Sequence, residues 1–229
     1  MKHIVFTLLA TLLLAGIVGR TRGDTFTWTG NGGNNSWDTV NNWDPPTFSG
    51  DDTGADLIYS GTPARQTSTA SGGNLSSDFS SITFASDLTL PINITGGGRF
   101  NGEGFIQNSD QPIQIDSSFA FRTTQWINGG TGSGKLTLNG SISKGQGRGH
   151  HAVNINNPGY DVEFAATFSE GNDHFHFVKS GAGDFLNSGT LRVSPQGDVT
   201  VQARSFTNNR SIGAANIVVS GGTFTGTGT

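Results

Sequence analysis

The sequence contains no cysteine, a single methionine at position 1 and few charged residues, which make up only 13% of the chain. Without cysteine, the protein forms no disulfide, uses no thiolate chemistry and carries no lipid on a cysteine. Charge is scarce compared with an ordinary globular domain, in which about 25% of residues are charged. Good helix formers such as Ala, Leu, Glu and Lys are also scarce after the first 20 residues, which argues against a helical protein.

Small polar residues and aromatic residues take the place of what is missing. Gly, Thr, Ser and Asn make up 104 of the 229 residues, and the chain also has 16 Phe and 4 Trp. These aromatic anchors are too many, and the net charge of −4 is too small, for a disordered chain. The composition therefore predicts a folded, all-β protein.

The N-terminus predicts export. Lys2 and His3 precede an apolar run at residues 4–18, which is shorter than a membrane span of about 20 residues but suits the core of a signal peptide. We expect residues 1–23 to be a cleavable signal peptide, with an uncleaved N-terminal anchor as the alternative. Cleavage after Gly23 would leave 10 basic and 17 acidic residues. That balance predicts no nucleic-acid partner and no membrane contact beyond the export signal.

Short runs of alternating polar and apolar residues recur along the rest of the chain, such as K-L-T-L at 135–138 and D-V-T-V at 198–201. Alternation places the apolar side chains on one face of a strand, and clusters of Gly and Asn between the runs indicate bends. No segment suits a crossover helix, and the spacing suggests coils of very roughly 20 to 25 residues. We expect a right-handed parallel β-helix, with a cap at 24–60 and solenoid repeats at 61–229. An antiparallel β-sandwich is the alternative.

Four stretches resemble one known family. The sequence W-T-G-N-G-G-N-N-S-W-D-T-V-N-N-W-D at 28–44 looks like the start of mature bacterial autotransporter-associated beta strand repeat proteins. The sequence V-K-S-G-A-G-D-F-L at 178–186 resembles the K-x-G-x-G-x-L-x-L core of the repeat, although Asp184 replaces the usual Thr and Asn187 follows. Weaker matches lie at 132–140 and 220–228.

The resemblance implies an exported β-helical passenger, secreted or displayed at the outer cell surface, with no shared catalytic residues and no cofactor. The chain ends at Thr229, within what would be the start of another turn. An open end of a β-helix exposes unpaired backbone groups. We therefore expect either a longer reading frame or an end covered by a partner.

Trp28, Trp37 and Trp43 form the densest aromatic group in the sequence. If they are exposed, they are candidates for stacking against sugars. If they are buried, they would cap the end of the solenoid, which is the interpretation we favour.

Two groups could bind a metal. Asp51, Asp52 and Asp56 cluster before an apolar run and could bind Ca²⁺, although a solvated turn accounts for them equally simply. His174 and His176 would project from the same face of a strand and could share a metal ion, or they could form a solvent-facing pair.

The Gly-rich run G-G-T-G-S-G-K-L at 129–136 lacks the hydroxyl after Lys135 that a phosphate-binding loop needs, and a strand rather than a helix is expected to follow it. We therefore expect no nucleotide. Because few residues could act as acids, bases or nucleophiles, the sequence favours a noncatalytic structural or adhesive protein whose partner is an extracellular polysaccharide or a cell-surface component. The alternative is a β-helix that binds or cleaves carbohydrate.

Overall fold

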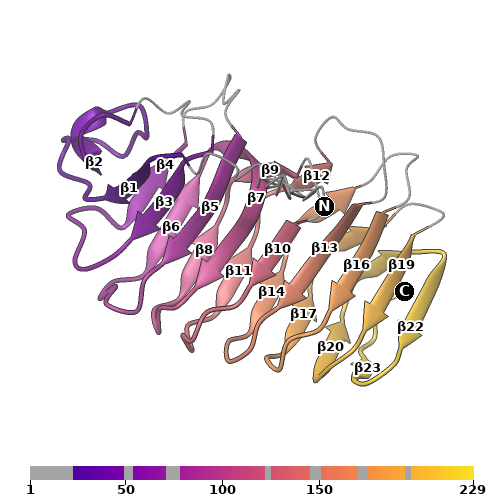
Figure 1. Cartoon of the computed structure of the whole chain (residues 1–229). Helices are drawn as coiled ribbons and strands as arrows, with labels where there is room; N and C mark the ends of the chain where they lie inside the picture. Colours follow the sequence, from indigo (N-terminus) through magenta and orange to yellow (C-terminus); the bar gives the residue numbers. More distant parts are fainter. Residues whose placement is uncertain are drawn as a thin grey trace, which may run out of the picture.

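The computed structural model describes residues 23–48, 54–70, 78–121, 125–144, 151–169, 175–193 and 197–229. Within these residues the chain coils into stacked turns, so that each strand lies beside the corresponding strands of the turns before and after it (Figure 1). All pairings between the described strands are parallel except that of β1 (Thr25–Trp28) with β2 (Trp43–Asp44). The prediction of a parallel β-helix is therefore confirmed, and the antiparallel sandwich is wrong.

An eight-stranded sheet forms one wall of the solenoid. Its strands, in stacking order, are β4 (Thr67–Thr69), β6 (Ile92–Thr95), β8 (Ile113–Ile115), β11 (Leu136–Leu138), β14 (Val162–Phe164), β17 (Phe185–Asn187), β20 (Ser205–Asn208) and β23 (Thr223–Thr225).

A fifteen-stranded sheet forms the rest of the wall and divides into two limbs. One limb contains β9 (Ser118–Phe121), β12 (Ile142–Lys144), β15 (Thr167–Ser169), β18 (Thr190–Arg192) and β21 (Ser211–Gly213). The other limb contains β1, β3 (Asp56–Tyr59), β5 (Asp78–Phe84), β10 (Gln125–Asn128), β13 (His151–Asn156), β16 (Phe175–Lys179), β19 (Asp198–Val201) and β22 (Asn216–Val219).

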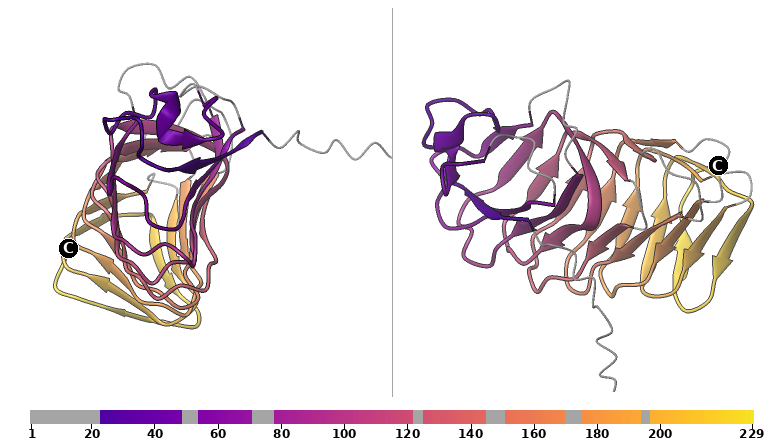
Figure 2. Two further views of the ribbon diagram at one scale, coloured as in Figure 1. Left: turned by 90° about the vertical axis from the view of Figure 1, so that its left-hand side faces the viewer. Right: turned by 45° about the horizontal axis from the view of Figure 1, so that its top comes forward.

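The long strand β7 (Gly97–Gln107) joins these limbs because it pairs with β9 through its first residues and with β10 near its end. Each later turn contributes one strand to the eight-stranded sheet and one to each limb. Figure 2 shows in its left view, along the stack, that successive turns follow nearly the same path.

The interior is filled by columns of apolar side chains, one from each turn. In the eight-stranded sheet Ile113, Leu136 and Val162 lie side by side in register, and all three are buried. Each buried side chain of this size contributes roughly 1.5–3 kcal/mol. Because Leu136 pairs with Val162 but Phe206 pairs with Phe224, these turns are 26 and 18 residues long. The turns are thus more variable in length than the sequence suggested, because the bends between strands absorb insertions.

Glycine is required where the bends of neighbouring turns touch. Gly130 has a φ of +96°, and a Cβ placed on it would lie 1.7 Å from the carbonyl oxygen of Gln107 in the turn before. A Cβ on Gly140 would lie 1.7 Å from the carbonyl oxygen of Ser117. Any side chain at these positions would push neighbouring turns apart.

The N-terminal end of the stack is closed by an aromatic cap. The ring of Trp43 packs against Trp28 and Phe48 with centroid separations of 5.1 and 4.6 Å, and its Nε1 donates a 2.9 Å hydrogen bond to the carbonyl of Trp37. A short 3-10 helix, η1 (Val40–Asn42), leads into β2, which covers the free edge of β1. The predicted aromatic cap is confirmed. It is not a separate unit, however, because β1 and β3 already belong to the parallel stack.

The last described turn is the least buried part of the stack. Ile217, Val218 and Val219 of β22 are 46%, 41% and 47% exposed. Within the preceding turns, one interior column changes from apolar residues to asparagine: Phe164 is followed by Asn187 and Asn208. The Nδ2 of Asn187 donates to the Oδ1 of Asn208 at 2.8 Å, so the buried amides continue the column as a hydrogen-bonded ladder.

Candidate ligand-binding face

The three tryptophans singled out as carbohydrate-stacking candidates do not form a binding surface. Trp28, Trp37 and Trp43 are 1%, 0% and 2% exposed, and their rings pack against one another inside the cap. The stacking role is therefore wrong for all three, because a buried ring offers no face to a sugar. These rings cover apolar surface at the end of the solenoid instead.

The metal-ligand candidates are not brought together by the part of the chain that the structure describes. Asp51, Asp52 and His174 lie outside the described residues. Asp56 is buried, and its Oδ1 accepts a 2.6 Å hydrogen bond from the hydroxyl of Ser81. Among the described residues no group of three or more His, Cys, Asp or Glu side chains could hold a metal ion.

His176 lies on the outer surface of the fifteen-stranded sheet, beside Asp198 of the next turn. Its Nδ1 accepts a 3.3 Å hydrogen bond from the backbone N–H of Asp198 and lies 3.9 Å from that residue's carboxylate. The Oδ1 of Asp198 also accepts a 2.8 Å hydrogen bond from the Nδ2 of Asn216, one turn further on. His176 therefore belongs to a polar ladder that connects three turns.

The outer surface of the eight-stranded sheet has the most continuous arrangement of polar groups. Inward residues such as Leu136 are each flanked by two outward residues, so the outward side chains form two rows that run along the solenoid axis. One row contains Pro91, Pro112, Lys135, Asp161, Asp184 and Ser205; the other contains Thr67, Asn93, Gln114, Thr137, Glu163, Leu186 and Thr207. We call the strip between these rows the axial track. Its floor is the backbone of the inward residues.

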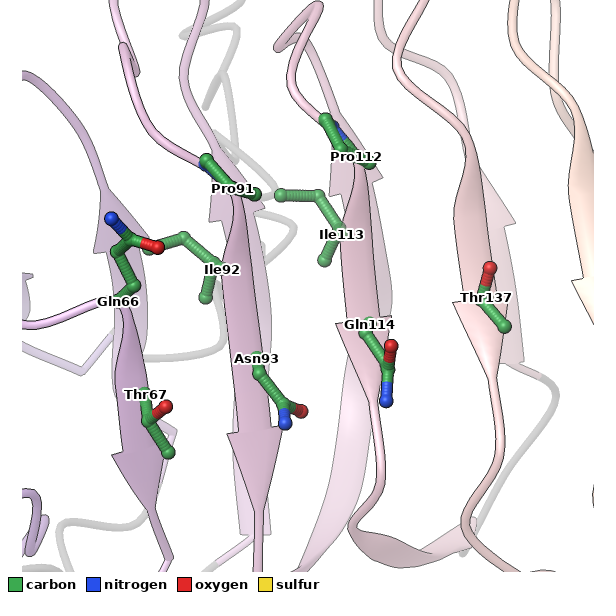
Figure 3. Close-up of a pocket in the computed structure, with 9 residues that line it drawn as sticks. All are labelled: Gln66, Thr67, Pro91, Ile92, Asn93, Pro112, Ile113, Gln114 and Thr137. Atoms are coloured by element: carbon green, nitrogen blue, oxygen red, sulfur yellow. The ribbon is translucent and has the colours of Figure 1, made fainter.

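The first part of the axial track is a shallow hollow of about 240 Å³ between β4 and β11. In Figure 3, Pro91 and Pro112 lie along one side of it and Thr67, Asn93 and Gln114 along the other, with Thr137 at the far end. Ile92 and Ile113 contribute to the lining although their side chains are buried in the core. The hollow thus combines proline rings with neutral amides and a hydroxyl.

A second hollow of about 230 Å³ continues the track from β11 to β20. Its rim includes Asp161, Asp184, Leu186 and Ser205. Between the hollows, the Nζ of Lys135 in one row reaches Glu163 in the other at 2.5 Å, so this ion pair crosses the track. An exposed pair of this kind is worth about 0–1 kcal/mol, so its side chains can turn aside for a ligand.

Carboxylates along this face are held by hydrogen bonds from neighbouring turns. Burial opposes ionisation of Asp116, but donation from the amides of Asn139, Gln114 and Asn93, at 2.8 to 2.9 Å, outweighs it and keeps the pKa of the carboxyl below its usual value. The pKa of Asp184 is also lowered, first by the hydroxyl of Ser205, which donates at 2.7 Å.

Lys179 is a residue whose position the sequence did not reveal. It lies within the repeat-like stretch at 178–186, yet its side chain points into the core between Ile155 and Val201 and is fully buried. Its Nζ donates to the carbonyl of Gly181 at the next bend. Burial lowers the pKa of its amine to about 8, although the charges of Asp184 and Asp161 oppose this shift and that of Arg204 adds to it.

The fold and this face define a parallel β-solenoid with a polar track along one wall. Comparison of the chain with family models, with curated proteins and with solved structures finds no match. Among the described residues, no helix has the length and apolar character to cross a membrane.

Proposed function

We propose that this chain is an exported, noncatalytic β-helical protein with a structural or adhesive role outside the cell or on its surface. The export signal expected at residues 1–23 and the resemblance to autotransporter-associated repeat proteins support this role. The stacked fold is compatible with it, because a solenoid presents extended, regular surfaces to partners.

The observation that carries the proposal is the use of acidic side chains to join turns. The carboxylate of Asp110 accepts a 2.8 Å hydrogen bond from the hydroxyl of Ser133 in the next turn, and Asp184 accepts one of 2.7 Å from Ser205. Both partners lie on exposed or half-buried surface, so these bonds cross-link the outside of the solenoid. Carboxylates engaged in this way serve the stack rather than general acid or base chemistry.

The dimensions also suit a structural or adhesive role. The eight strands of one wall lie about 4.8 Å apart, so this wall extends for about 34 Å along the axis. The apolar columns and the cross-links between turns fix these faces in one arrangement, which reduces the entropy cost of binding a surface.

Export and catalysis can be tested together. The full chain, expressed in a bacterial host, is expected outside the cytoplasm with residues 1–23 removed, as shown by N-terminal sequencing. Incubation of the purified protein with plant, fungal and bacterial polysaccharides is expected to release no reducing ends. Turnover at enzymatic rates, or retention of the intact leader in the cytoplasm, would contradict the proposal.

Adhesion needs a separate measurement. Beads coated with the protein are expected to be retained on intact cells under flow, whereas albumin-coated beads wash away. Equal retention of the two kinds of bead would exclude an adhesive role.

A further inference from the structure

The axial track has the length and regularity of a site for a linear polymer. Its two hollows lie on the same wall and meet at β11, where Thr137 lines one hollow and Lys135 the other. Together they cross seven of the eight strands of the wall, from β4 to β20. A small molecule would fill one hollow only, whereas an extended chain would lie along both.

The spacing of the track suits one class of polymer. Neighbouring turns are about 4.8 Å apart, which is close to the length of one pyranose unit in an extended glycan. A glycan parallel to the solenoid axis would therefore meet an equivalent pair of outward side chains at each successive sugar.

The side chains of the track match sugar chemistry. Amides such as Asn93 and Gln114 both donate and accept hydrogen bonds, as sugar hydroxyls require. The rings of Pro91 and Pro112 in the first hollow, and Leu186 in the second, offer apolar contact to the C–H groups of a sugar ring.

The charge of the track selects for neutral glycans. In the second hollow the carboxylates of Asp161 and Asp184 line the rim with Lys135, and Glu163 pairs with that lysine. Acidic groups thus outnumber the basic group along this stretch, so a polymer of uronic acids or sulfated sugars would be repelled. A neutral glycan would instead donate its hydroxyls to these oxygens.

We propose that the axial track binds a neutral, linear polysaccharide laid along the solenoid axis, with one sugar unit for each turn. This inference rests on the proposed function, because it identifies the face and the ligand through which an adhesive β-helix would act. It replaces the buried tryptophans with a surface on the opposite side of the core columns.

The test uses isothermal titration calorimetry of the purified protein with cellohexaose, laminarihexaose and mannohexaose, with an alginate hexamer as the anionic control. At least one neutral hexasaccharide is expected to bind, and its disaccharide is expected to bind at least tenfold more weakly because it contacts fewer turns. Alginate is expected not to bind. Absence of binding by all three neutral glycans, or stronger binding of alginate, would overturn the proposal.

A matched pair of variants tests the position of the site. Thr137→Arg places a long side chain on the track beside Glu163, whereas Ser143→Arg places the same side chain on the outer surface of the fifteen-stranded sheet in the same turn. We expect Thr137→Arg to weaken glycan binding at least tenfold and Ser143→Arg to change it less than twofold. Circular dichroism checks that both variants fold. Equal affinities in the two folded variants would refute the assignment.

Failure of this inference can be told apart from failure of the proposed function. If coated beads adhere to cells but the purified protein binds none of the neutral glycans, the adhesive role stands and the axial track is not its glycan site. If beads carrying Thr137→Arg adhere less than beads carrying Ser143→Arg, adhesion itself depends on the track.

Discussion

Replacing Lys179 by methionine is expected to stabilise the protein at neutral pH. The lysine occupies an inward position between Ile155 and Val201, where its side chain is fully buried. Its pKa of about 8 compares with an ordinary value of 10.5. At about 1.36 kcal/mol for each pKa unit, burial of the charged amine costs roughly 3 kcal/mol.

The variant Lys179→Met keeps the volume of the side chain and removes this cost. It also removes the hydrogen bond that Nζ donates to the carbonyl of Gly181, which is worth about 1 kcal/mol. The net expectation at pH 7 is a variant more stable by about 2 kcal/mol, in line with other buried charges replaced by well-packed apolar residues.

The pH dependence follows from the direction of the pKa shift. Below about pH 8 the amine of Lys179 is charged in both the folded and the unfolded chain, so its cost is present in full. Between about pH 8 and 10.5 the unfolded chain binds the proton more strongly, so the wild-type protein becomes more stable as the pH rises. The advantage of Lys179→Met should therefore shrink by about 2 kcal/mol between pH 7 and pH 9.5.

Urea unfolding of both proteins, followed by far-ultraviolet circular dichroism at pH 7, 8, 9 and 9.5, measures this difference. Circular dichroism is preferred to tryptophan fluorescence because Trp28, Trp37 and Trp43 report on the cap at the other end of the stack. Other titrating groups affect both proteins alike and cancel in the comparison. A constant stability difference across the pH range would refute the assignment of a buried, charged amine to Lys179.

Three further predictions concern stability. Trp43→Ala should cost about 3–5 kcal/mol in urea unfolding because it leaves a cavity in the cap, whereas Val40→Ala, which alters an exposed side chain of the same cap, should cost almost nothing; similar losses would contradict the packing described for the cap. Gly130→Ala should cost at least about 1–3 kcal/mol because of its φ of +96° and the adjacent carbonyl, and an unchanged melting temperature would argue against this contact. The pKa of Glu163 is lowered, chiefly by the hydrogen bond from Lys135, so its contribution is present above the unfolded pKa of about 4.3 and is lost as the pH falls through the lower folded value. The melting temperatures of the wild-type protein and Glu163→Gln should therefore converge between pH 5 and 3, and a gap that does not narrow would exclude this linkage.

The fold could be predicted from the sequence because its main determinants are local. The alternation at 135–138 and 198–201 gives strands β11 and β19 with one buried face, as expected. The clusters of Gly and Asn mark bends, and the absence of a crossover helix leaves coiling as the way to pair strands in parallel. Burial of Trp43 in the cap also follows from its sequence neighbourhood, because an end of a solenoid must cover apolar surface.

The position of Lys179 could not be predicted in the same way. Lysine is almost never fully buried unless it is paired, and the stretch V-K-S-G at 178–181 contains nothing that marks it as interior. The strand alternation alone leaves open which of Val178 and Lys179 points inward. The pairing of Lys179 with Ile155 and Val201 decides this, and that pairing depends on how many residues each bend contains.

The axial track is a property of register in the same sense. Its rows bring Gln114 beside Thr137 and Thr137 beside Glu163, although the residues in each pair are 23 and 26 positions apart in the chain. Because the turns vary from 18 to 26 residues, no fixed repeat in the sequence aligns these side chains. The aromatic residues are conspicuous in the sequence but serve the core, whereas an inconspicuous series of amides, hydroxyls and prolines becomes a continuous surface only after the turns are stacked. In a solenoid, a search for function should therefore begin with the outward rows of each wall, because register alone decides which polar residues meet there.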